Sequence, residues 1–172
     1  FYAKNKYIGQ ISGFRFKQFG RTSKNHEFSL LTSTWGWAIW NDRWNEFIAY
    51  DLNKSLTQIE KSRLKKILFN SFGFYNYYLL LKKQISKYYS WGVVFYAYSF
   101  NNKKLTLIPS ESLIENIGFD DESTNTKGVN LFQQKINLSK PIRFSRIGKF
   151  RIIQKYLKAI YLSYAASRYP SK

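Results

Sequence analysis

Apolar runs separated by polar breaks predict a chain that mixes strands with helices. Residues 7–12 and 27–31 each place bulky apolar residues among polar ones, which favours two short strands. Residues 105–108 form a third run, preceded by a polar turn and ended by Pro109, which cannot donate a backbone hydrogen bond to a sheet. We therefore expect an α/β fold with a mixed sheet and flanking helices.

Longer stretches have helical spacing of their apolar residues. Ser55 and Gln58 have the spacing of a capping box, so we expect a helix that begins at Ser55, after a break at residues 51–53, and ends at Gly73. Residues 77–85 predict a second helix. Residues 91–100 are apolar and aromatic throughout, which fits a buried helix and a buried strand equally well. Residues 150–164 predict a basic amphipathic helix.

Tryptophan is concentrated in one stretch, where four of the five tryptophans fall within residues 35–44. The positions of Trp37, Trp40 and Trp44 predict one face of a helix, with Gly36 just before it. An amphipathic helix that packs on a sheet explains Trp40 and Trp44, which we expect in the core. We expect Trp35 and Trp37 to line a cleft as an aromatic wall for a flat ligand, such as a sugar ring or a base.

The charge of the chain restricts the partners that it can have. The 172 residues carry a net charge of +18, and all eleven charged residues from Ser123 onward are Lys or Arg. Such a balance attracts nucleic acid, anionic lipid or phosphorylated ligands. The hydrophobic content of 44% excludes a disordered chain, and the absence of cysteine excludes disulfides and thiolate metal sites. No apolar run is long enough to span a membrane.

One polar loop, residues 118–126, contains the group Asp120, Asp121 and Glu122. Carboxylates grouped on a loop can bind a hard cation such as Mg²⁺, or one of them can act as a general base. An ordinary solvated turn has the same composition. His26 is the only histidine, and on a polar loop we expect it to be a bystander.

Four blocks of sequence resemble the bacterial nucleotide-diphospho-sugar transferases of the GT-A type. The first is Phe28-Ser29 followed by Trp35–Trp44, which is similar to that family's "FS…WGWATW" block. The others are residues 90–109, residues 112–126 with the Asn-Ile-Gly-Phe-Asp motif, and Ile11-Ser12-Gly13. Their order and spacing agree with the family over about residues 7–127.

The resemblance implies a glycosyltransferase that moves a sugar from a nucleotide-diphospho-sugar donor to a glycan or lipid-linked acceptor. Asp120 would be the catalytic base, and the substrate-binding residues would be Trp35, Trp37, Trp91, Asp121, Thr124 and Asn125. The resemblance also implies a divalent cation, Mg²⁺ or Mn²⁺, with its main ligands in an N-terminal half that this chain lacks. The missing initiator methionine agrees with a C-terminal portion, which we expect to be inactive when isolated.

The chain departs from the family pattern at two positions. Asn125 replaces a histidine that suits a cation or phosphate contact, and Gly92 replaces an acidic residue that suits a general base.

We expect residues 1–140 to form the acceptor-side half of a GT-A-like domain and residues 141–172 a basic helical tail. For such a transferase we expect a cytoplasmic location, with the tail at the inner face of the cell membrane. The alternative is a non-catalytic basic module that binds nucleic acid or anionic membrane, of which nucleic acid is the less favoured.

Overall fold

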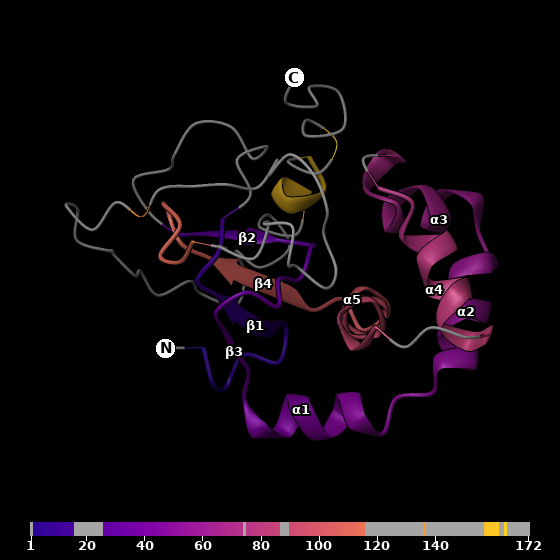
Figure 1. Cartoon of the computed structure of the whole chain (residues 1–172), viewed down its shortest axis with the longest axis horizontal. Coiled ribbons are helices and arrows are strands. Elements are labelled where there is room, and N and C mark those ends of the chain that lie inside the picture. The colour runs from indigo at the N-terminus through magenta and orange to yellow at the C-terminus, as the bar shows by residue number, and fades with distance from the viewer. Residues whose placement is uncertain are drawn as a thin grey trace, which may run out of the picture.

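A four-stranded mixed sheet forms the centre of the molecule in the computed structural model, which describes residues 2–15, 26–73, 75–86, 90–115, 136, 157–161 and 164. The strands are β1 (Ile8–Ser12), β2 (Glu27–Ser29), β3 (Trp37–Ala38) and β4 (Leu105–Ile108), in the order β2-β4-β1-β3. The inner strands β1 and β4 are parallel, and each outer strand is antiparallel to its neighbour. The expectation of an α/β fold with a mixed sheet is confirmed (Figure 1).

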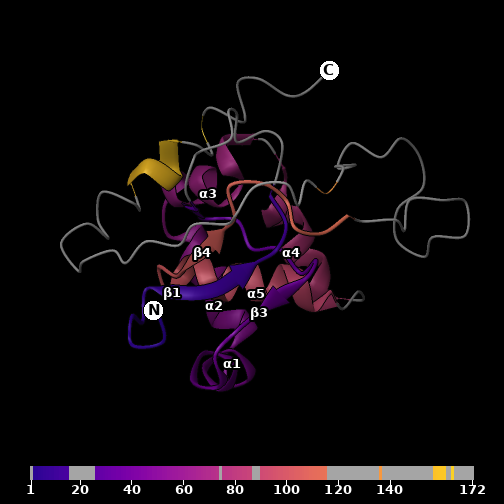
Figure 2. The ribbon, with the colours of Figure 1, turned by 90° about the vertical axis from the view of Figure 1, so that its left-hand side faces the viewer.

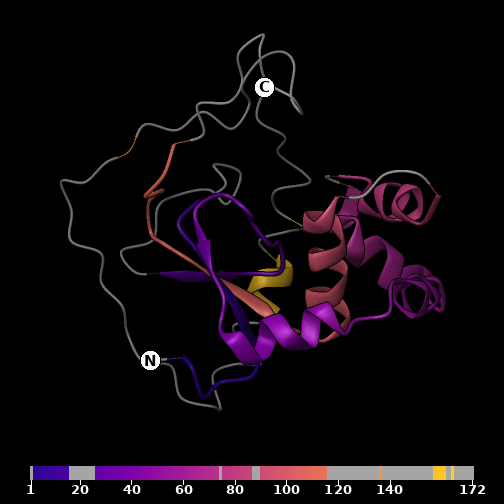
Figure 3. The ribbon, with the colours of Figure 1, turned by 60° about the horizontal axis from the view of Figure 1, so that its bottom comes forward.

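The helix α5 (Trp91–Asn101) connects the sheet to the other helices, and residues 94–100 of it are buried on all sides. A helix that is apolar all round is stable only inside a protein core, which is why periodicity could not distinguish it from a strand. Two of its buried tyrosine hydroxyls are hydrogen-bonded: Tyr96 Oη donates to Phe69 O at 2.9 Å, and Tyr98 Oη donates to Glu46 Oε2 at 2.8 Å. Figure 3 shows α5 between the sheet and a group of three further helices.

These three helices are α2 (Leu52–Glu60), α3 (Arg63–Phe69) and α4 (Tyr77–Ser86), with a short 3₁₀ helix, Ser71–Gly73, between the last two. The predicted helix start at Ser55 is wrong, because the carboxylate of Asp51 accepts from the backbone N–H groups of Asn53 and Lys54 at 2.9 and 3.1 Å. Asp51 is therefore the N-cap, and Ser55 is a buried residue inside α2. Ser62 caps α3 in turn, so one predicted helix is two.

The predicted tryptophan face of a helix is also wrong. Trp37 belongs to β3 and pairs with Ser12, Trp40 is the extended residue before the helix, and α1 (Asn41–Ile48) contains Trp44 alone of the three. Gly36, at φ +50°, turns the backbone so that Trp37 enters the sheet before the helix can begin. Trp40 and Trp44, which we expected in the core, are half-buried and pack against the outside of two different core groups.

The C-terminal residues 157–161 are helical and pack on the sheet. Ala159 is buried in a core group with Ile8, Phe28 and Leu105, and Lys158 forms an ion pair with Glu27 at 2.7 Å. Figures 1 and 2 show this segment and α1 on opposite sides of the sheet. The remainder of the predicted helix over 150–164, apart from Tyr164, lies outside the described residues. Within the described ranges, every helix is too short or too polar to cross a bilayer.

His26 does not lie on an exposed polar loop, contrary to the expectation. It is buried, its Nε2 lies 3.0 Å from Tyr2 Oη, and its ring meets the edge of Phe28. Because His26 immediately precedes β2, its side chain enters the core between the N-terminal segment and the sheet. It is a structural residue of this core.

Candidate functional site

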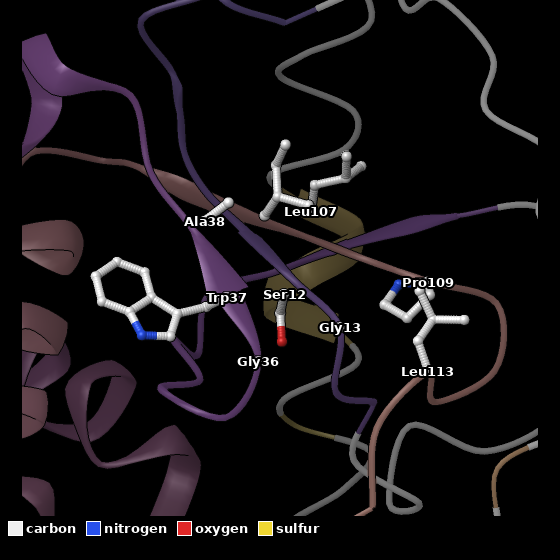
Figure 4. Close-up of a pocket in the computed structure, with 9 residues that line it drawn as sticks. Ser12, Gly13, Gly36, Trp37, Ala38, Leu107, Pro109 and Leu113 are labelled. Atoms are coloured by element: carbon white, nitrogen blue, oxygen red, sulfur yellow. The ribbon is translucent and has the colours of Figure 1, made fainter.

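A cavity of about 290 Å³ opens at the edge of the sheet where the parallel strands β1 and β4 end. Carboxyl ends of parallel strands are where ligands bind in open α/β sheets, because the connections there diverge and leave a crevice. The lining residues come from three segments of the chain: Ile11, Ser12, Gly13, Gly36, Trp37, Ala38, Leu107, Pro109 and Leu113. Figure 4 shows Trp37 on one side of the cavity and Pro109 and Leu113 on the other.

Backbone hydrogen bonds at Gly13 hold the three segments together. Gly13 N donates to Gly36 O at 2.7 Å, and Leu113 N donates to Gly13 O at 2.8 Å. The chain passes so closely here that a Cβ atom on Gly36 would lie 2.8 Å from two carbon atoms of Ile114. Gly36 is required both by this contact and by its positive φ.

Trp37 lines the cavity, and its indole belongs to an aromatic group beside it. Its ring centroid lies 5.3 Å from that of Trp91, 5.5 Å from Phe95 and 6.0 Å from Trp44. Figure 4 shows the Trp37 ring directed toward the helices. Trp91, the first residue of α5, retains 37% of its exposure, so it forms the solvent side of this aromatic group.

Trp35 lies apart from the other aromatic residues of the predicted wall. Its ring meets Phe14 edge-on at 4.8 Å, its backbone N donates to Ser33 Oγ, and it does not line the cavity. The structure therefore brings Trp37 and Trp91 together, whereas Trp35 packs against Phe14 instead. Gly36, which is in the left-handed region, turns the chain between Trp35 and Trp37.

Arg15 and Glu27 support the cavity wall from behind, and sequence reasoning missed both. The buried Arg15 guanidinium donates to Pro109 O at 3.1 Å and to Glu27 Oε2 at 2.8 Å, while Arg15 N donates to Ser112 Oγ at 3.4 Å. Burial by itself would raise the pKa of the Glu27 carboxyl. The hydrogen bonds and charges of Lys158 and Arg15 outweigh burial, so the pKa of Glu27 lies below its usual value.

Another buried polar residue, Gln10, fixes the segment that leads to Trp35. Its side-chain amide donates to Ser33 O, and its Oε1 accepts from Ser33 N at 3.3 Å and from Thr106 Oγ1 at 3.1 Å. The sequence signal for this contact was a glutamine within a predicted apolar strand, because a buried amide needs hydrogen-bond partners. Gln10 thus joins β1, β4 and the loop before β3.

Few polar groups face the cavity from the described part of the chain. Ser12 Oγ is already engaged with the backbone of Phe14, donating to its O and accepting from its N at 3.0 Å. The predicted base Asp120 and the predicted ligand-binding residues Asp121, Thr124 and Asn125 lie outside the described residues. Gly92 packs against Thr34, whose Cγ2 would be 3.3 Å from an added Cβ.

Among the residues with described positions, no three His, Asp or Glu side chains come together as a metal site. The described lining is mostly apolar and lies beside an aromatic group, and such a cavity suits the apolar face of a ring. Comparison of the chain with protein-family models, with curated proteins and with solved structures gave no match.

Proposed function

We propose that the chain is the C-terminal, acceptor-side portion of a glycosyltransferase of the GT-A type, which transfers a sugar from a nucleotide-diphospho-sugar to a glycan or lipid-linked acceptor. The observation that carries the proposal is the cavity at the carboxyl ends of β1 and β4, with Trp37 on its wall and Trp91 beside it. The cavity lies where three of the sequence blocks that resemble this family meet: Ile11–Gly13, the tryptophan stretch and the segment after β4.

In the proposed reaction, the acceptor hydroxyl attacks the anomeric carbon of the donor sugar. The new C–O bond forms as the bond to the diphosphate breaks, and the hydroxyl proton passes to the carboxylate of Asp120. Trp37 and Trp91 hold a sugar ring through its apolar face, and Asp121, Thr124 and Asn125 hydrogen-bond its polar groups. The divalent cation, which would stabilise the leaving diphosphate, has its main ligands outside this chain in this proposal.

Titration of the intrinsic tryptophan fluorescence with nucleotide-diphospho-sugars and with free mono- and oligosaccharides tests the binding role. Trp91→Ala is expected to weaken sugar binding about tenfold, because the variant loses one stacking face of the aromatic group. The matched control is Tyr75→Ala, which removes an aromatic ring that is 50% exposed just before α4. A chain with no saturable response to any sugar, or an equal loss in both variants, would contradict the proposal.

A further inference from the structure

The helices α3 and α4 lie in one of two long parts of the chain without acidic residues, the other being the part from Ser123 onward. Between Glu60 and Glu111 there are nine Lys and Arg residues and no Asp or Glu. Three of the basic residues, Arg63, Lys65 and Lys66, are in α3, and two, Lys82 and Lys83, are in α4. This part of the molecule is therefore strongly positive, although it contains the helices most distant from the sheet (Figure 1).

Both helices also expose large apolar side chains on their outer sides. In α3, Leu64 is 63% and Ile67 is 41% exposed, one turn apart and opposite the buried Phe69. In α4, Leu79 is 48% exposed and lies opposite the buried Leu81. Because Phe69 and Leu81 belong to the same core group, the opposite sides of both helices point away from that core. The arrangement leaves apolar side chains in solvent, where they contribute nothing to the fold.

A cation–π contact joins α3 to α4. The Lys66 ammonium lies 3.6 Å from the centroid of the Tyr78 ring, and the Lys82 ammonium lies 5.7 Å from it. Tyr78 Oη in turn donates to Glu60 Oε1 at 2.6 Å, at the end of α2. We call the residues Arg63, Leu64, Ile67, Leu79 and Lys82 the α3–α4 surface.

We propose that the α3–α4 surface rests on an anionic lipid bilayer. Apolar side chains surrounded by Lys and Arg match the boundary between acyl chains and acidic headgroups. There the apolar side chains are buried among the acyl chains, and Lys and Arg pair with the headgroups. Nucleic acid would engage the cations and leave Leu64, Ile67 and Leu79 in water.

The inference does not rest on the proposed sugar transfer, and its test uses no sugar. The 172-residue chain is sedimented with vesicles of phosphatidylcholine alone and with vesicles that also contain phosphatidylglycerol. Binding is expected to the anionic vesicles only and to weaken as salt rises. Arg63→Gln combined with Lys82→Gln should weaken binding about 25-fold, from about fivefold for each charge removed. The charge control is Lys4→Gln combined with Lys6→Gln, two exposed residues near the N-terminus.

The apolar contribution is tested separately. Leu64→Gln should weaken vesicle binding about tenfold or more, because the leucine no longer enters the bilayer boundary. The matched control is Ile48→Gln, which changes a residue that is 66% exposed at the end of α1. Figure 1 shows α1 apart from α3 and α4. Thermal melts of all four variants establish that each remains folded.

Four results would overturn the proposal: no binding to anionic vesicles, equal binding to both kinds of vesicle, equal losses in the surface and control variants, or tighter binding to duplex DNA than to vesicles. A surface variant that melts early is replaced by Ile67→Gln, which changes the same surface at another position. Binding that is lost in the surface variants and retained in the controls supports the proposal whether or not the chain transfers sugar.

Discussion

Replacing Glu27 with glutamine should destabilise the molecule more than Lys158→Gln or Glu115→Gln. Glu27 accepts from two cations in different surroundings: the Arg15 side chain is 3% exposed, and the Lys158 side chain is 50% exposed. In Glu27→Gln, the Arg15 guanidinium remains buried with no countercharge from Glu27, and losing one partner of a buried pair costs about 3–5 kcal/mol. Lys158→Gln breaks the solvent-exposed half of the network and should cost about 1 kcal/mol or less.

Urea unfolding at neutral pH, followed by far-UV circular dichroism, measures both losses. The matched control is Glu115→Gln, because Glu115 is an exposed glutamate in the segment after the cavity wall. Its loss of stability should lie within about 0.5 kcal/mol of zero. Hydrogen exchange adds a local readout, since Arg15 also holds Pro109 O, and the amides of residues 110–115 should exchange faster in Glu27→Gln.

The dependence on pH follows from the direction of the pKa shift. The pKa of Glu27 is lower in the folded protein than in the unfolded chain, where it is about 4.3. The stabilisation is therefore present above the unfolded pKa and is lost as pH falls through the folded pKa. Wild type and Glu27→Gln should differ by a constant amount near neutrality and converge in acid. Equal losses for Glu27→Gln and Lys158→Gln, or a difference that persists in acid, would refute the assignment.

Two further predictions concern the cavity and the proposed chemistry. Gly36→Ala should cost at least about 1–2 kcal/mol in urea unfolding because of its positive φ, and Ile114→Ala in that background should restore only the part due to the contact. No loss in Gly36→Ala would contradict the backbone assignment. In a longer polypeptide that carries the donor half, Asp120→Asn should lower turnover about 10²–10⁴-fold with donor affinity unchanged, and Asp121→Asn should lower it less. Unchanged turnover would remove Asp120 from the role of base.

Three of the four strands were predictable because each is a short apolar run bounded by turn residues. Residues 7–12, 27–31 and 105–108 correspond to β1, β2 and β4 within a few positions, and residues 77–85 correspond to α4. The tryptophan stretch was misassigned because a helical spacing of three residues is weaker than the turn that Gly36 imposes. The start of α2 was misassigned because Asp51 and Ser55 are both good caps, and a local pattern does not choose between them.

The candidate site was predictable only where a residue's type signals its role. The tryptophan stretch pointed to Trp37 and to Gly36 before it, whereas Trp91 was expected at the site only from the resemblance to the transferase family. It could not find Arg15, whose partners Pro109 and Ser112 are more than ninety positions away. Contacts at such separation depend on the order of strands in the sheet, which no local pattern contains.

The position of Glu27 relates the C-terminal segment to the cavity. Lys158 contacts one oxygen of Glu27, Arg15 contacts the other, and Arg15 holds the carbonyl of Pro109 on the cavity wall. Because Ala159 is buried beside this network, the C-terminal helix cannot leave the sheet without exposing that core position and removing one of the two cations from Glu27. The described part of the tail is therefore a structural support of the cavity wall. This role accounts for one of the tail's positive charges within the protein, whereas Arg63 on α3 and Lys82 on α4 are exposed to solvent.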